Sequence, residues 1–232
     1  MQILPQQVMG YDRATSVFSP DGRLLQVEYA KKAVSQGAMA IGIVCRDAVL
    51  LMADRRIVDS LIVRESVKKI FEIDKHIVTT ASGLISDARV LVKKCRVYAQ
   101  QYRLTYGKGI DIESLIKYIS DMEQLYTQYG GIRPFGISFL MASVDKLGPK
   151  LFVTEPSGIY FSFKAQAIGV GSAEANKILE RKYRAGLKLE EGARLAKAIF
   201  KRILGKDFSA ARLEVAAVTS KGIQFLDVEK IK

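Results

Sequence analysis

Few residues of this chain have the types and spacing that catalysis or metal binding usually requires. His76 is the only histidine, and the cysteines, Cys45 and Cys95, show no CxxC pair and no His/Cys ligand spacing. The patterns GxxxxGKS, GxxxxGKT, GxGxxG, HExxH and GxSxG are absent. The Gly-Val-Gly run at residues 169–171 could form a weak anion nest, but a tight turn is the better interpretation. We therefore expect no metal, no cofactor, and a solvent-facing turn position for His76.

The second chemical feature is a strong positive charge. The 36 Lys and Arg residues exceed the 24 Asp and Glu residues and give a net charge of +12. Such a charge suits nucleic acids or acidic partners. However, Arg181, Lys182 and Arg202 fall near the ends of predicted helices, where cations complement the helix dipole. No zinc finger, KH loop or RRM motif accompanies them, so we favour solvated helix faces, keep steering of acidic partners as an alternative, and expect no nucleic acid.

Length and composition indicate one domain. A chain of 232 residues with 49% hydrophobic residues can bury roughly 70 to 75% of the surface that its unfolded form exposes. The N-terminal run MQILPQQVMG lacks the pattern of a signal peptide, and no apolar run approaches the ~18 residues of a membrane span. We expect a soluble cytoplasmic protein, without contact to a membrane, whose cysteines are buried and reduced.

Apolar periodicity predicts the order of the elements. Strand pairs are predicted within residues 38–53 and 67–81, helices at 84–102 and 112–126, strands at 135–144, 150–153, 159–163 and 165–168, helices at 173–183 and 190–204, and a final hairpin within 213–226. Runs of strands that alternate with pairs of helices favour stacked sheets covered by helices over a regular βαβ series. No linker or internal repeat divides the chain.

A further helix is predicted near the N-terminus. Ser19 can cap a helix and Pro20 suits its first position, where no backbone N–H is needed. The apolar stripe of this helix comprises Leu24, Leu25, Val27, Ala30, Ala33 and Val34. Such a stripe predicts a helix that packs on another surface.

Three strings carry a family resemblance. Residues 11–34 read YDRATSVFSPDGRLLQVEYAKKAV, residues 82–91 read SGLISDARVL, and residues 126–136 read YTQYGGIRPFG. In this order they resemble the α subunits of the 20S proteasome, and the length and composition resemble the archaeal type. The resemblance implies an α+β fold, a four-layer αββα sandwich of two antiparallel sheets between helix layers (Ntn-hydrolase-like), with an extra N-terminal helix. It also implies a flexible gate tail at residues 1–10 and a single domain at residues 11–232.

The family contains active β subunits and inactive α subunits. In active members the nucleophile is a threonine, freed as the N-terminal residue by cleavage after a glycine, and its own amine accepts the proton. At the equivalent position this chain has Gly37 followed by Ala38, which has no hydroxyl, while Asp54 and Lys69 match the acid and lysine positions. We expect these two residues to form a buried pair, which cannot perform acyl transfer alone. The resemblance therefore implies a non-catalytic subunit. The alternative is an active threonine peptidase of the same fold, which Ala38 disfavours.

Family α subunits form a seven-membered ring on each end of the β chamber, and their N-terminal tails close the axial pore. By matching motif positions, Tyr11, Asp12, Pro20 and Tyr29 would hold the open gate. The alternative is that these residues are a capping aspartate and packing tyrosines. The implied partners are other α subunits, β subunits, an activator ATPase and unfolded protein substrates in transit.

Activators of the family insert C-terminal tails into pockets between neighbouring α subunits. Lys69 matches the lysine that receives the tail carboxylate, and Gly83 and Leu84 match the pocket backbone and its apolar lining. Lys31 stands where archaeal relatives usually carry arginine, so the charge is kept and the bidentate geometry is lost. Lys68 stands where a glutamate is usual, which makes the pocket more basic. Without the motif, Lys69 would be interpreted as a solvated lysine or as a charge that pairs with a helix.

Overall fold

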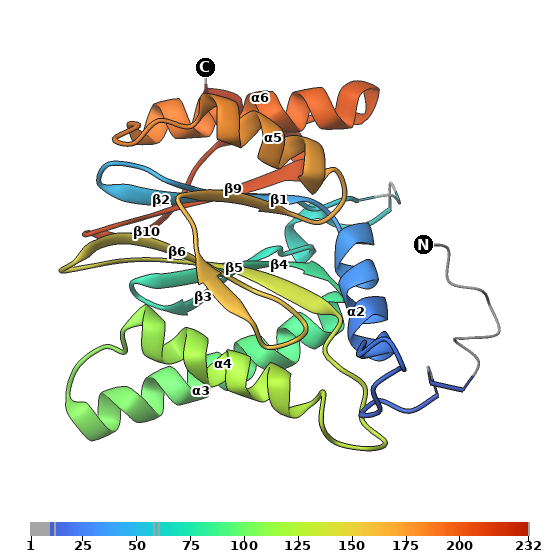
Figure 1. Ribbon diagram of the computed structural model, residues 1–232. Coiled ribbons are helices and arrows are strands. Elements are labelled where there is room, and N and C mark those ends of the chain that lie inside the picture. Colours follow the sequence, from blue (N-terminus) through green and yellow to red (C-terminus); the bar gives the residue numbers. More distant parts are fainter. Residues whose placement is uncertain (1–9, 12, 58, 60, 232) are drawn as a thin grey trace.

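Two five-stranded antiparallel sheets lie between two pairs of helices in the computed structural model (Figure 1). The structure describes residues 10, 11, 13–57, 59 and 61–231. The first sheet has the order β10-β9-β2-β1-β8, with β1 Ala40–Val44, β2 Ala48–Asp54, β8 Ala165–Ile168, β9 Leu213–Thr219 and β10 Gly222–Phe225. The second has the order β3-β4-β5-β6-β7, with β3 Ile70–Asp74, β4 Ile77–Gly83, β5 Ile137–Asp145, β6 Gly148–Thr154 and β7 Tyr160–Ser162. The predicted αββα sandwich is confirmed.

Each sheet is covered on its outer face by two antiparallel helices (Figure 1). Helices α3, Ile85–Tyr106, and α4, Ile112–Leu125, lie against the second sheet. Helices α5, Ser172–Lys182, and α6, Leu189–Leu204, lie against the first. Among the described residues, no helix is both long enough and apolar enough to cross a membrane.

Strand β2 shows how the sequence builds the layers. Successive side chains of a strand point to opposite faces, so a strand buried on both sides reads as a continuous apolar run. Val49 and Leu51 enter the apolar layer between the two sheets, whereas Leu50 and Met52 enter the layer beneath α5 and α6. All seven residues of β2 are buried. Each large apolar side chain buried in this way contributes about 1.5–3 kcal/mol to stability.

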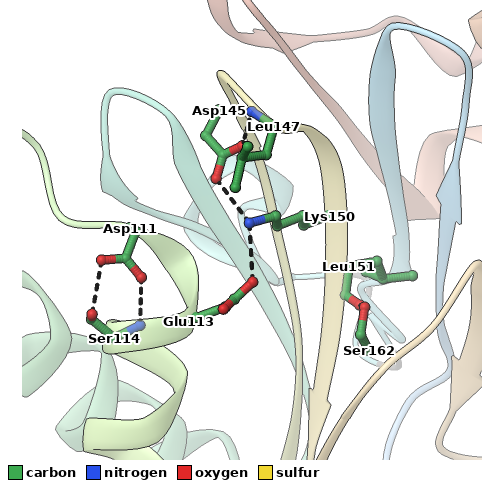
Figure 2. A network of polar contacts seen from close by, with 8 residues as sticks. All are labelled: Asp111, Glu113, Ser114, Asp145, Leu147, Lys150, Leu151 and Ser162. Carbon is green, nitrogen blue, oxygen red and sulfur yellow. Dashed lines mark hydrogen bonds and ion pairs between the residues drawn. The ribbon is translucent and has the colours of Figure 1, made fainter.

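The start of α4 is attached to the hairpin between β5 and β6 (Figure 2). Asp111 caps the helix by accepting a hydrogen bond of 2.8 Å from the backbone N–H of Ser114. Lys150 on β6 lies between two carboxylates, with Nζ 3.0 Å from Glu113 and 3.2 Å from Asp145. This network links the start of α4, in the outer helix layer, to the second sheet.

The predicted start of the N-terminal helix is wrong. Helix α2 spans Leu25–Gln36, and its N-cap residue, Leu24, makes no side-chain capping bond. Residues 19–22 form a β-turn instead, in which the Gly22 N–H donates to the Ser19 carbonyl at 2.8 Å. Gly22 has φ +73°, which glycine adopts without strain. Serine, proline and a following glycine suit a turn as well as a helix start.

The other predicted strands and helices are present, with ends shifted by a few residues. His76 does lie in a turn, but its prediction as a solvent-facing residue is wrong. Its side chain is only 27% exposed, and its Nε2 lies 2.7 Å from the Ile110 carbonyl oxygen. The turn at residues 169–171 is confirmed, with Gly169 and Gly171 both at positive φ. Both cysteines are free and buried, as predicted.

Candidate functional site

Helix α2 lies across one edge of the sandwich, against the ends of β4 and β5 (Figure 1). Leu25, Val27 and Ala30 are buried within the chain itself, while Tyr29 is 46% exposed. The apolar stripe that predicted packing on another surface is thus largely covered by this chain's own sheet. The helix carries the polypeptide to Gly37 and Ala38, the position at which active family members would expose a nucleophile.

Four backbone segments meet at the C-terminal end of α2, and glycines allow the close approach. Gly83 has φ +108°, and a Cβ atom there would lie 2.0 Å from the Gly136 carbonyl oxygen. A Cβ atom on Gly37 would lie 2.1 Å from the Gly83 nitrogen. The Val170 N–H donates to the Gly37 carbonyl at 2.8 Å, which brings in the segment after β8. We call Gly37, Gly83, Gly136 and Gly169 the glycine junction.

An ion pair holds the loop before β5 against the glycine junction. Asp87, in the first turn of α3, accepts hydrogen bonds from both terminal nitrogens of Arg133 at 2.6 and 2.7 Å. It also accepts one from the Gly136 N–H at 3.0 Å. Burial alone would raise the pKa of Asp87, but the bonds from Arg133 and Gly136 outweigh it and the pKa lies below its ordinary value.

Ala38 is buried, with 8% of its surface exposed, and its side chain is a methyl group. Its nitrogen belongs to the peptide bond with Gly37, so it is not a free amine. The residue supplies neither of the two groups on which an N-terminal threonine relies.

Asp54, which matches the catalytic acid position, is paired with a different cation from the one expected. The Nε and Nη2 atoms of Arg212 donate to its two carboxylate oxygens at 2.7 and 2.6 Å. The backbone N–H of Arg56 adds a third bond at 2.8 Å. The sequence interpretation of a buried Lys69–Asp54 pair is therefore wrong, because Arg212 holds the carboxylate.

Lys69 is 4% exposed, and its backbone is firmly anchored. Its N–H donates to Glu214 at 2.7 Å, and its carbonyl accepts from Thr80 at 2.8 Å. In the described part of the chain, its ammonium group has no ion-pair or hydrogen-bond partner. Burial lowers the pKa of Lys69 to about 8, and the negative charges of Asp54 and Glu214 oppose this shift only in part.

Lys69, Gly83 and Leu84 line one cavity of about 620 Å³ beside the C-terminal end of α2. The structure thus brings together three of the four residues predicted for the docking pocket. Lys31 does not line this cavity. Its Nζ lies 2.5 Å from a carboxylate oxygen of Glu155, in the turn before β7.

Three further cationic residues that line the cavity were not predicted from the sequence, namely Arg55, Arg56 and Arg89. Arg55 and Arg56 follow β2 directly, whereas Arg89 lies in the second turn of α3. The side chain of Arg56 donates to the Gln36 carbonyl at 3.1 Å and so reaches the end of α2. For Arg55 and Arg56, the sequence signal was the cluster of charged residues after Asp54. This cluster does not indicate where the side chains point.

Three of the four residues predicted for the gate lie among the described residues, and all three are exposed. Tyr11 is 38% exposed, and Pro20 and Tyr29 are exposed as well. No hydrogen bond or ion pair connects these three side chains within the described residues. Asp12 and residues 1–9 lie outside the described residues, so their predicted roles stay predictions. No group of three or more His, Cys, Asp or Glu side chains in the described ranges could hold a metal ion.

Comparison with protein families gives two matches that together cover most of the chain. Residues 34–218 match the model of the proteasome subunit family. Residues 11–33 match the N-terminal signature of the A-type subunits of the proteasome. The second match coincides with the exposed turn and helix α2 that precede Ala38.

Curated relatives extend the similarity over the whole chain. A proteasome subunit alpha of Methanocaldococcus jannaschii is 48% identical over all of this chain and 88% of the relative. That of Thermococcus sibiricus is 49% identical over 97% of this chain and 85% of the relative. That of Methanopyrus kandleri is 46% identical over all of this chain and 94% of the relative.

Proposed function

We propose a function for this chain, which belongs to the archaeal-type α subunits of the 20S proteasome family. In this proposal it is a non-catalytic subunit of the outer seven-membered ring. In this function it assembles with other α subunits and with β subunits in the cytoplasm. It controls the entry of unfolded protein substrates into the β chamber, and it docks the C-terminal tails of an activator ATPase. The proposal includes a flexible gate tail at residues 1–10 and a single domain at residues 11–232.

The observation that carries the proposal is the continuity of the chain from α2 through Gly37 to Ala38. Helix α2 packs its apolar face on the domain, so removing the residues before Ala38 would expose the ends of β4 and β5. A subunit that keeps this helix cannot present a free amine at residue 38. The retained helix therefore supports a structural role and not that of a threonine nucleophile.

The non-catalytic role is tested by labelling. The chain is prepared alone and together with a proteasome β subunit, treated with a threonine-directed covalent inhibitor, and analysed by intact mass spectrometry. We expect the label on the β subunit only, which serves as the positive control. Inhibitor-sensitive peptide hydrolysis by this chain alone, with the label on one of its own residues, would contradict the proposal.

Ring formation and gating are tested separately. Native mass spectrometry of the chain with the β subunit is expected to show seven-membered rings, and a persistent monomer would contradict ring membership. Deletion of residues 2–10 is expected to speed hydrolysis of a short peptide by the assembled particle, because the tail obstructs the pore. The rate at which the inhibitor labels the β subunit within an opened particle is the control. Equal peptide rates with and without the tail would argue against the gate.

The docking function is supported by the cavity that Lys69, Gly83 and Leu84 line. An ammonium group without a partner can donate to a tail carboxylate, and such a charge-assisted bond contributes roughly 1.5–3 kcal/mol. We expect Lys69→Ala to lower the affinity of each pocket for a tail peptide about tenfold to a hundredfold. Lys221→Ala, in the exposed turn between β9 and β10, is the matched control. Full stimulation of the Lys69 variant by activator would contradict this role, whereas failure to form rings would make Lys69 a structural residue.

A further inference from the structure

The cavity beside the end of α2 has an unusual charge. Five cationic residues line it, and none of its described lining residues is acidic. The five are Arg55, Arg56, Lys68, Lys69 and Arg89. They come from the segment after β2, the segment before β3 and helix α3, so the fold and not a local run of charge gathers them. A volume of about 620 Å³ is within the range of small-ligand sites.

Two carboxylates lie near these cations, and both already accept hydrogen bonds. Asp54 is bound by Arg212 and by the Arg56 amide. Glu214 accepts hydrogen bonds from the backbone N–H groups of Lys69 and Ile70 at 2.7 and 3.2 Å. Glu214 also forms an ion pair of 3.8 Å with Arg55, and both acids attract the Lys69 ammonium. Among the described residues, however, neither acid accepts a hydrogen bond from a cationic side-chain group that lines the cavity.

Two cationic groups therefore lack a hydrogen-bond acceptor within the described part of the chain. The ammonium of Lys69 has none among the described residues, and neither does the buried Nε of Arg55, which lies 3.8 Å from Glu214. A buried donor or charge without a partner costs free energy, so a ligand that supplies acceptors is favoured at this place.

The backbone at Arg56 supports a built site. Arg56 is the only described residue other than glycine with positive φ, at +46°. A left-handed conformation costs an ordinary residue about 1–2 kcal/mol and persists only where its surroundings hold it. Here the Arg56 N–H bonds to Asp54 and the side chain bonds to the Gln36 carbonyl, which fixes the guanidinium at the cavity.

We propose that this cavity binds a small anion with several negative charges, of the oligophosphate class. A single tail carboxylate brings one negative charge to five cations, whereas a triphosphate group brings several charges and many acceptor oxygens. The shared chemistry is the triphosphate group, which can come from inorganic triphosphate or from a nucleoside triphosphate. The binding itself does not depend on the proposed docking function. Its consequence does, because an anion at Lys69 occupies the place of the tail carboxylate.

The test is titration calorimetry of the full chain with inorganic triphosphate at constant ionic strength. We expect saturable binding of one triphosphate per chain. Lys68→Glu and Arg89→Glu each reverse a charge at an exposed position, and each is expected to weaken binding by about tenfold or more. Lys221→Glu makes the same charge change far along the chain and is expected to leave the affinity within about twofold. Thermal unfolding shows that each variant is folded.

Three outcomes would overturn the inference. The first is no saturable binding to the wild-type chain, and the second is an equal loss in the Lys221 variant, which would indicate a general charge effect. The third is binding of a nucleoside triphosphate but not of inorganic triphosphate, which would indicate recognition of the base. In a separate arm, a labelled activator-tail peptide is added to assembled rings with and without triphosphate. If the peptide never binds, the docking function fails while the calorimetry still decides the anion site.

Discussion

At its C-terminal end helix α2 meets three other backbone segments, whereas at its N-terminal end it follows an exposed turn. The glycine junction brings main-chain atoms so close that no Cβ atom fits at Gly37 or Gly83. At the other end, Gly22 has free space around it, and Ser19 and Arg23 are joined by a backbone bond of 2.9 Å. One helix thus has one tightly constrained end and one loosely constrained end.

The contrast separates two roles in one element. The constrained end holds Ala38 and the Lys69 cavity, where a binding pocket needs fixed walls. The loosely constrained end carries Pro20 and leads to Tyr11, where the proposed gate needs alternative arrangements. If this division is correct, substitutions at the C-terminal end will change the stability of the whole domain, and substitutions at the N-terminal end will act locally.

The largest effect is expected for Gly83→Ala. Its φ of +108° strains any residue with a side chain, and the new methyl group would overlap the Gly136 carbonyl oxygen. We expect a loss of roughly 4 kcal/mol or more in the free energy of unfolding, measured with denaturant. Gly107→Ala is the control, because Gly107 also has positive φ but nothing near it. That variant should lose only about 1–2 kcal/mol, and equal losses would refute the importance of the close approach.

The second-largest effect is expected in the pH dependence of the unfolding free energy, which Lys69 influences. Its pKa is about 8 in the folded chain and about 10.5 in the unfolded chain. Between these values the unfolded state binds the proton and the folded state does not, so stability rises with pH in this window. Relative to Lys69→Met, the wild type should gain up to about 3 kcal/mol from pH 8 to 10.5. The two stability curves should run in parallel below pH 8, and parallel curves throughout would show that burial leaves the lysine unaffected.

Asp87→Asn is expected to have the third-largest effect on stability. The substitution removes a charge that accepts bonds from Arg133 and the Gly136 amide. Since Arg133 is about half exposed, we expect a loss of about 1–2 kcal/mol in unfolding free energy at pH 7. The pKa of Asp87 is lowered by folding, so its contribution is present above the unfolded pKa and disappears as the pH falls through the folded pKa. Glu174→Gln, which breaks the exposed pair with Arg202, should cost much less.

The smallest effect on global stability is expected for Arg23→Ala at the N-terminal end. Arg23 bonds to Glu28 through two nitrogens at the surface of the helix. Loss of an exposed pair leaves the thermal midpoint nearly unchanged. Limited proteolysis followed by mass spectrometry should nevertheless show faster cleavage between residues 11 and 24, because the turn before α2 opens more often. Lys32→Ala, on the same helix, is the control. A large drop in the thermal midpoint would mean that this end is also constrained.

The periodicity of apolar residues was sufficient to predict most of the strands and helices. Strand β8 coincides with its predicted range, and α6 begins one residue before its own predicted start. The agreement is close because apolar repeats reflect the faces that the layers bury. The start of α2 could not be predicted, because Ser19 and Pro20 suit a cap and a turn equally well. The Ser19 N–H donates to the Arg23 carbonyl, and this bond, which no sequence pattern reveals, favours the turn.

The site was predictable only in part. The family resemblance placed Lys69, Gly83 and Leu84 together, although they come from separate segments. It paired Asp54 with Lys69, whereas the structure pairs it with Arg212, 158 positions away. Both cations are compatible with the sequence, and only the three-dimensional arrangement decides which one is in bonding distance. The position of Arg89 at the cavity depends on the direction of α3 in the same way.

The Asp54–Arg212 pair also has an evolutionary consequence. A threonine at residue 38 would still be joined to Gly37 by a peptide bond, and the acid it needs would still be bound to Arg212. Hydrolysis would require a hydroxyl, a free amine and a released carboxylate together, so no single substitution restores it.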